Sequence, residues 1–129
     1  ITLFGWAFKK NTNDSRESAS IYLAKILIEN HIKVNVYDPM VSKERIIDDL
    51  NQLGLEANSS VLEVFKSPDQ AAESSSGIAF CTEWDEFKTL DFKTIFKLMG
   101  NSPWIFDGRN TLNINLLEEC GFNVYSIGK

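Results

Sequence analysis

The chain contains 129 residues, of which 43% are hydrophobic and 12% aromatic, so it can form one buried core and is not a disordered protein. Its net charge of −5 excludes the basic footprint that nucleic acids and anionic membranes require of a partner. No apolar run has the length of a membrane span, and Cys81 and Cys120 lack metal-ligand spacing. We expect a metal-free protein of the reducing cytoplasm. Because Ile1 lies inside a predicted strand, we interpret the chain as part of a longer polypeptide.

The first half of the chain alternates strand patterns with helix patterns. Short apolar or alternating stretches predict three strands, over residues 1–8, 33–38 and 61–65. Asp14, with Glu17 three residues later, has the pattern of a helix N-cap, and an apolar stripe at helical spacing continues to Asn30. Two shorter helices are expected, within residues 42–53 and after Pro68.

The second half continues this alternation. Three further strands are predicted, over residues 77–82, 104–107 and 122–127. Asp91 caps a helix that Gly100 closes, and a last helix ends at Gly121. Strands separated by helices pair in parallel through right-handed crossovers. The sequence therefore predicts one Rossmann-like α/β domain over residues 1–129, a doubly wound parallel sheet of about six strands flanked by helices.

This fold predicts where a ligand would bind. In a doubly wound sheet the crevice lies outside the carboxyl ends of the strands, near the point where the strand order reverses. Three segments leave predicted strands at this edge, namely residues 8–14, 82–85 and 108–110. These segments also contain the charged and aromatic side chains that are best suited to a ligand.

The first segment belongs to the stretch GWAFKKNTNDSRES, which has cations where a dinucleotide-binding turn has glycines. A glycine-rich turn binds pyrophosphate through backbone N–H groups, whereas Lys9 and Lys10 reach a phosphate as flexible point charges. Arg16 is predicted in the first helical turn, where a cation opposes the helix dipole and costs up to about 1 kcal/mol unless an anion compensates it. The alternative interpretation is a set of solvated surface cations, with Arg16 paired to Asp14 and Glu17.

The third segment places Arg109 at the end of another strand, after the flexible Gly108. The fork of an arginine suits a phosphate or the carbonyl at a base edge, although a surface pair with Asp107 explains the same residue. Two cationic segments at one edge favour a phosphate or nucleotide ligand more than either segment does alone.

Two other side chains at this edge also have alternative interpretations. Trp84 would stack on a base or cover a domain interface, and the interface is the more frequent role. Asp38 stands where a dinucleotide domain binds a ribose hydroxyl, but without a glycine fingerprint we favour a cap for the turn at Pro39. The sequence shows no Ser/His/Asp set, no His/Cys cluster and no paired catalytic carboxylates. This composition is typical of a binding domain without a reaction centre.

Taken together, GWAFKKNTNDSRES, CTEWDEF and IFDGRN resemble the C-terminal, UDP-binding domain of the UDP-glucose/GDP-mannose dehydrogenase family. The resemblance covers essentially all of the chain. The double lysine, Lys9 and Lys10, is similar to that of the eukaryotic UDP-glucose branch. Trp6 and Asn11 replace residues that are more usual in the family, and residues 53–60 do not align with it.

The resemblance implies an enzyme that oxidises UDP-glucose to UDP-glucuronate with two NAD, through a cysteine-bound thiohemiacetal. It implies that Phe8, Lys9 and Arg109 contact the UDP-sugar and that Arg16 reaches NAD. NAD would lie mainly on an N-terminal domain of the same polypeptide, which is missing here together with the catalytic cysteine. Enzymes of this family are usually homo-oligomers, with a dimer or hexamer expected. We therefore expect no catalytic residue in this chain and no activity from it alone.

Three alternatives stay open. A related domain acting on GDP-mannose or UDP-N-acetylmannosamine has the same outline. A non-enzymatic, flavodoxin-like nucleotide-binding or regulatory module would need acidic residues at the end of a central strand, whereas residues 1–8 end in apolar residues followed by cations. A structural dimerisation domain would leave those cations without a role. Cys81 and Cys120 do not match the catalytic motif of the family and are interpreted as buried structural thiols.

Overall fold

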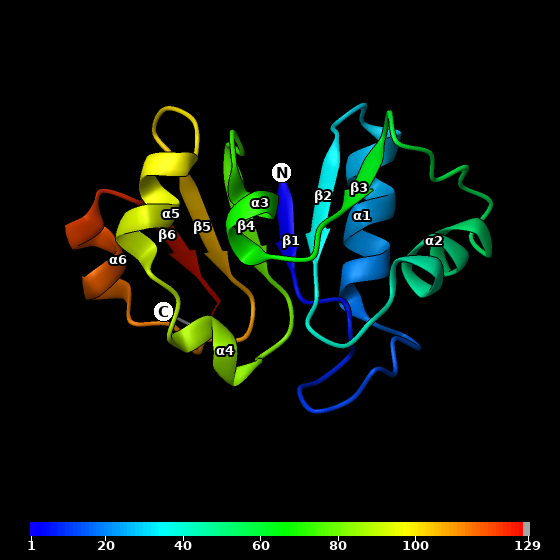
Figure 1. Cartoon of the computed structure of the whole chain (residues 1–129), viewed down its shortest axis with the longest axis horizontal. Helices are drawn as coiled ribbons and strands as arrows, with labels where there is room; N and C mark the ends of the chain where they lie inside the picture. The colour runs from blue at the N-terminus through cyan, green and yellow to red at the C-terminus, as the bar shows by residue number, and fades with distance from the viewer. Residues whose placement is uncertain (128–129) are drawn as a thin grey trace.

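Six parallel strands form one sheet in the order β3-β2-β1-β4-β5-β6 (Figure 1). The strands are β1 (Thr2–Phe4), β2 (Val34–Tyr37), β3 (Leu62–Val64), β4 (Gly77–Phe80), β5 (Trp104–Asp107) and β6 (Asn123–Ser126). This computed structural model describes residues 1–127. The chain builds outward from β1 to one side and then from β4 to the other, so the sheet is doubly wound, as predicted.

Helices connect the strands and lie on both faces of the sheet (Figure 1). They are α1 (Ala19–Glu29), α2 (Lys43–Asn51), α3 (Pro68–Ala72), α4 (Asp85–Lys88), α5 (Phe92–Leu98) and α6 (Ile114–Cys120). α1 and α2 pack together beside β1–β3, while right-handed crossovers place α3, α5 and α6 on the opposite face, where they contact one another. The strand order confirms the Rossmann-like fold and excludes the flavodoxin-like alternative, whose order is 2-1-3-4-5.

Aromatic side chains fill the core beneath the point where the strand order reverses. The ring of Phe4 in β1 lies 5.1 Å from that of Phe80 in β4 and 5.3 Å from that of Phe87 in α4. Tyr37 of β2 completes this buried group. Since these rings hold β1, β2 and β4 together, the loops that leave those strands start from fixed positions.

β1 is shorter than predicted and ends at Phe4. Gly5 follows with a φ of 101°, and a Cβ at this position would lie 2.4 Å from Thr82 Oγ1, so only glycine satisfies both conditions. Trp6 and Ala7 are fully buried, but in a turn. Their apolar character extended the strand pattern beyond the strand itself, and the two lysines that follow lie in a loop.

The predicted N-cap of the first helix is wrong. α1 begins at Ala19, and Ser18 caps it by accepting a hydrogen bond from Ser20 N at 3.2 Å. Asp14 instead accepts hydrogen bonds from the backbone N–H and the guanidinium of Arg16. Because Arg16 lies in the loop before the helix, the expected conflict with the helix dipole does not arise.

The remaining elements agree with the prediction apart from small shifts at their ends. Asp91 caps α5 through Thr94 N, and Gly121 ends α6 with a φ of 108°. The structure adds α4, which has no periodic stripe to predict it because only Phe87 among its four residues is buried. No helix in the described part of the chain is both long and apolar enough to cross a membrane.

Candidate functional site

The turn after β1 is closed internally by Asp38. Its Oδ2 accepts the backbone N–H groups of Trp6 (2.6 Å) and Ala7 (3.0 Å). Its Oδ1 accepts those of Met40 and Val41, which confirms the predicted cap of the turn after β2. In a dinucleotide-binding domain the N–H groups of this first turn face a pyrophosphate. Here a carboxylate of the protein occupies that place, so the turn is not free to bind a pyrophosphate through its backbone.

Trp84 belongs to the same cluster. Its indole N–H donates to Asp38 Oδ2 at 3.1 Å, and only 7% of the residue is exposed. Both sequence interpretations, base stacking and cover for a domain interface, are therefore wrong, because the side chain lies in the core of this domain. The ribose-binding role weighed for Asp38 also has no support, since both carboxylate oxygens are engaged.

A second buried carboxylate, Asp49 of α2, fixes the loop between β1 and α1. It accepts hydrogen bonds from the indole N–H of Trp6 (2.9 Å) and the hydroxyl of Ser15 (2.5 Å). Arg45 Nε donates to Asp49 at 3.1 Å and to Ser15 Oγ at 3.0 Å. The loop is thereby attached near both of its ends, while the lysines between these points remain at the surface.

Glu83 joins the first and third segments of the predicted binding edge. Its Oε1 accepts the backbone N–H of Lys10 (2.7 Å), and its Oε2 accepts a hydrogen bond from the guanidinium of Arg109 (2.5 Å). Lys10 Nζ in turn lies 3.2 Å from Asp85. Burial alone would raise the pKa of Glu83, but hydrogen bonds from Arg109 and from the backbone lower it. The three segments expected at one edge do meet there, and this carboxylate connects them.

The side chain of Arg109 pairs with a different carboxylate from Asp107, the partner named in the alternative interpretation of the sequence. That carboxylate is Glu83. Asp107 is 1% exposed and accepts the backbone N–H groups of Arg109, Thr111 and Leu112 at 2.9–3.1 Å. Asp107 therefore fixes the backbone of the turn. The guanidinium stays partly exposed and has N–H groups beyond the one that Glu83 engages.

Phe8, Lys9 and Arg16 all lie in the exposed loop between β1 and α1. Lys9 Nζ is 5.5 Å from the centroid of the Phe8 ring, within the range of a cation–π contact. Phe8 and Arg16 line one cavity of about 690 Å³ between this loop, α1 and α2, whereas Arg109 lines a different cavity. The structure thus groups the first three residues in one loop and places Arg109 across Glu83 from that loop.

Arg16 forms the surface pair that the alternative interpretation described. Its guanidinium lies 2.7 Å from Asp14, and its side chain is 79% exposed. The hydrogen bonds from Arg16 lower the pKa of Asp14 to about 2. A pair this exposed is weak, so another anion can replace the carboxylate.

The two cysteines are poor candidates for a reactive site. Cys81 directly follows β4, and burial raises the pKa of its thiol to about 11. Cys120 is the last residue of α6. Neither cysteine is in a disulfide, and both are partly buried, so the prediction of buried thiols holds only in part. Residues 1–127 contain no group of His, Cys, Asp or Glu side chains that could hold a metal ion.

Two residues that organise this edge, Glu83 and Asp49, had no role in the sequence-based prediction. The available signal for Glu83 was its position directly after a strand at the binding edge, within CTEWDEF. Asp49 stands in an amphipathic helix, where a charged residue predicts exposure. Its burial depends on Trp6, which is 43 residues away in the sequence, and no local pattern encodes such a contact.

These features define an α/β domain of the nucleotide-binding type whose first turn is closed by its own carboxylate and whose cations lie on loops at the carboxyl edge of the sheet. The model of the UDP-glucose/GDP-mannose dehydrogenase family, UDP binding domain, matches residues 2–114. The chain belongs to this family.

Individual relatives agree with that assignment. The chain is similar to UDP-glucose 6-dehydrogenase of Drosophila melanogaster, with 41% identity over all of this chain and 28% of that protein. It is 42% identical to UDP-glucose 6-dehydrogenase of Gallus gallus, over all of this chain and 27% of that protein. Among solved structures, a UDP-D-ManNAc dehydrogenase from Pyrococcus horikoshii gives a TM-score of 0.72 at 26% identity, over 99% of this chain and 25% of that one. The chain spans about a quarter of the length of these relatives and matches the C-terminal part of the curated ones.

Proposed function

We propose that this chain is the UDP-sugar-binding domain of an NAD-dependent dehydrogenase that oxidises UDP-glucose to UDP-glucuronate. Membership of the family and about 40% identity to animal UDP-glucose 6-dehydrogenases support this substrate class. The junction at Glu83 carries the assignment, because it brings the loop of Lys9 and Lys10 and the turn of Arg109 together where β1 and β4 leave the sheet.

Lys9 and Arg109 then hold the nucleotide sugar from two loops. No carboxylate within residues 1–127 pairs with Lys9, so an incoming phosphate meets a cation that is already free of an ion pair. Arg109 keeps its bond to Glu83 and offers its other N–H groups to a phosphate or a base carbonyl. Phe8 contributes its exposed ring beside Lys9.

NAD does not fit this chain as its main site. The amides of the first turn and the oxygens of Asp38 are engaged within the protein, so neither a pyrophosphate nor a ribose finds its usual partners there. Arg16 is the one cofactor contact that we assign, because its exposed guanidinium can exchange Asp14 for a phosphate. The rest of the NAD site and the catalytic cysteine belong to the N-terminal part of the same cytoplasmic homo-oligomer, a dimer or hexamer.

Equilibrium titration of the complete enzyme with UDP-glucose tests the two sugar-binding cations. A charge-assisted hydrogen bond contributes about 1.5–3 kcal/mol, so Lys9→Ala and Arg109→Ala should each weaken binding roughly 10- to 150-fold. Lys10→Ala is the matched control, since Lys10 Nζ is engaged by Asp85 at the surface. If Lys9→Ala and Lys10→Ala lowered the affinity for UDP-glucose by the same small factor, the loop would be a solvated basic patch and not a binding site.

The same titration with other nucleotide sugars tests the substrate. UDP-glucose should bind more tightly than GDP-mannose or UDP-N-acetylmannosamine. Tighter binding of GDP-mannose or UDP-N-acetylmannosamine would assign the domain to the dehydrogenase that oxidises that sugar instead.

Steady-state kinetics test the cofactor contact. Arg16→Ala should raise the KM for NAD more than the KM for UDP-glucose, because a contact made in both the ground and the transition state is lost mainly from KM. The opposite order would assign Arg16 to the sugar.

A further inference from the structure

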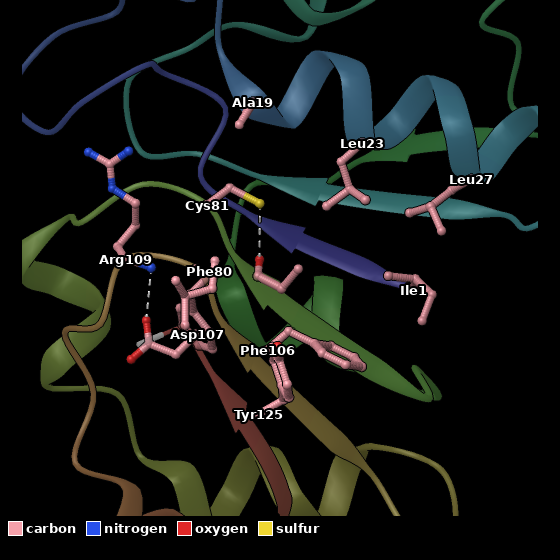
Figure 2. Close-up of a pocket in the computed structure, with 13 residues that line it drawn as sticks. Ile1, Ala19, Leu23, Leu27, Phe80, Cys81, Phe106, Asp107, Arg109 and Tyr125 are labelled. Carbon is pink, nitrogen blue, oxygen red and sulfur yellow. Dashed lines mark hydrogen bonds between the residues drawn. The ribbon is translucent and has the colours of Figure 1, made fainter. Parts of the chain in front are cut away.

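Two of the three arginines in the chain, Arg16 and Arg45, line one polar cavity of about 710 Å³. This cavity lies between the loop that follows β1 and the turn that leads from β2 into α2. Its other lining residues are Thr12, Asn13, Asp14, Met40, Val41 and Ser42. The third arginine, Arg109, lines a separate groove of about 500 Å³ among apolar side chains (Figure 2). The polar cavity therefore has two positive charges and one negative charge in its lining, although the whole chain is acidic.

Arg45 is held by one edge of its guanidinium. Its Nε donates to Asp49 at 3.1 Å and to Ser15 Oγ at 3.0 Å, and both of these acceptors are buried. Within residues 1–127 no hydrogen bond engages its two Nη groups, and the side chain is 45% exposed. The buried acceptors thus fix the orientation of the guanidinium and leave its terminal N–H groups for a ligand.

Arg16 comes from a different segment and is held more loosely. Its guanidinium pairs with Asp14 at 2.7 Å, and its side chain is 79% exposed. An ion pair in solvent is weak, so an anion with two negative charges can take the place of the single charge of the carboxylate. The cavity thus combines one arginine that is already oriented with another that can close on a ligand.

The position of the cavity in the fold also suits an anion. β1 and β2 are neighbours in the sheet, and in doubly wound domains an arginine near the end of the second strand accommodates a ribose phosphate. α2 begins at Lys43, so the positive end of its dipole lies next to Ser42, a lining residue. Asp38 closes the first turn but does not line this cavity. The turn that has lost its pyrophosphate site is therefore separate from this place.

We propose that Arg16 and Arg45 together bind one phosphate group in this cavity. The planar fork of an arginine matches two oxygens of a phosphate, and two forks from different segments can hold one group between them. The proposal goes beyond the function assigned above and shares only Arg16 with it. The same chemistry has two sources, namely the pyrophosphate of NAD and a free phosphate or phosphate monoester.

Calorimetric titration of the complete enzyme with inorganic phosphate tests this site. UDP at saturation occupies Lys9 and Arg109 and, without a sugar, cannot be oxidised. Arg16→Gln and Arg45→Gln should each weaken phosphate binding about tenfold or more, because each removes a charge-assisted hydrogen bond. Lys43→Gln is the matched control and should change the affinity less than about twofold, since Lys43 is an exposed cation at the start of α2 that does not line the cavity. Wild-type affinity in Arg45→Gln, equal losses in all three variants, or no phosphate binding by the wild type would overturn the proposal.

Asp14→Asn gives a readout that damage to the fold cannot produce. The substitution removes the charge that competes for Arg16 and keeps an oxygen that can accept the backbone N–H of that residue. Phosphate binding should become roughly 2- to 5-fold tighter, in keeping with the small contribution of an exposed pair. Unchanged or weaker binding would overturn the proposal.

The same titration in the presence of saturating NAD distinguishes the two sources of phosphate. If NAD displaces inorganic phosphate from the wild type, the cofactor supplies the group and Arg45 is a second cofactor contact beside Arg16. If phosphate still binds and still depends on both arginines, the site takes a free phosphate or a phosphate monoester. That second result would support the two-arginine site and would overturn the assignment of Arg16 to NAD.

Discussion

Two groups of carboxylates near the ends of β1, β2 and β4 have opposite surroundings. Asp38 and Asp49 are 8% and 7% exposed, and their partners include backbone N–H groups, two indole N–H groups and a serine hydroxyl. Glu83 and Asp14 lie nearer the surface and hold arginine side chains. Of the inner carboxylates, Asp38 takes the place of a nucleotide as the anion of the first turn, and Asp49 fixes the loop that follows. The outer ones pair with Arg109 and Arg16, two of the three cations that we assign to a nucleotide sugar and NAD.

This comparison shows how a nucleotide-binding fold can change its ligand without changing its strands. Once the backbone of the first turn is satisfied by Asp38, a phosphate is no longer needed to complete the turn. Binding then depends on side chains of the following loop. We expect the inner group to determine stability and the outer group to determine affinity, and the predictions below test that division.

The largest loss of stability should follow Asp38→Ala. Five N–H donors lose their acceptor, and each buried unsatisfied donor costs about 1–3 kcal/mol, so the free energy of unfolding should fall by about 4 kcal/mol or more. Asp85→Ala, at an exposed pair with Lys10, should cost less than about 1 kcal/mol. Urea denaturation measures both. Similar losses would mean that the buried carboxylate does not hold the turn.

Gly5→Ala should cost about 3 kcal/mol, the second-largest effect. A left-handed conformation costs an L-residue about 1–2 kcal/mol, and the new Cβ would in addition meet Thr82. Gly54→Ala separates the two terms, because Gly54 has a φ of 84° but no atom within 4 Å of the added Cβ. That control should cost only about 1–2 kcal/mol in the same denaturation experiment. Equal costs would show that the turn relaxes away from Thr82.

The inner group also shows what the sequence could not reveal. Hydrophobic periodicity located all six strands and the binding edge, because burial on one or two faces leaves a local pattern. The burial of Trp6 in a turn and of Asp49 in a helix was not predicted, since it comes from a contact between segments far apart in the chain. A tryptophan in an apolar run predicts a strand, and an aspartate in an amphipathic helix predicts solvent.

The outer group was easier to find but harder to interpret. Cations after strands of a doubly wound sheet indicated the edge, and three segments do meet there. Which carboxylate each cation chooses depends on loop geometry. For this reason the alternative interpretation of Arg109 names Asp107 as its partner, where the structure has Glu83. For the same reason Arg16 is predicted in a helix that in fact begins three residues later.

Glu83→Ala should affect affinity more than stability. Without this carboxylate the guanidinium of Arg109 must be ordered on binding, and ordering one long side chain costs about 0.5–1.5 kcal/mol. UDP-glucose binding by the complete enzyme should therefore weaken roughly 2- to 12-fold. In the Arg109→Ala background the same change should have little further effect, because no guanidinium remains to be ordered. Tighter binding after Glu83→Ala would instead identify Glu83 as a competitor of the ligand.

The smallest effect concerns Asp14 and Arg16, where the expected change is a pKa and not a loss of stability. Hydrogen bonds from Arg16 lower the pKa of Asp14 from 3.8 to about 2. A depressed folded-state pKa means that the pair contributes above the unfolded-state pKa and is lost as the pH falls through about 2. In a carboxyl-carbon NMR titration, Arg16→Gln should therefore raise the pKa of Asp14 part of the way to its ordinary value, because the backbone N–H of residue 16 still donates to the carboxylate, whereas Lys9→Gln should leave it low. Saturating NAD in the complete enzyme should also raise the pKa of Asp14, because a cofactor phosphate that takes Arg16 leaves the carboxylate without its partner. An unchanged pKa with NAD bound would show that Arg16 keeps Asp14 and does not contact the cofactor.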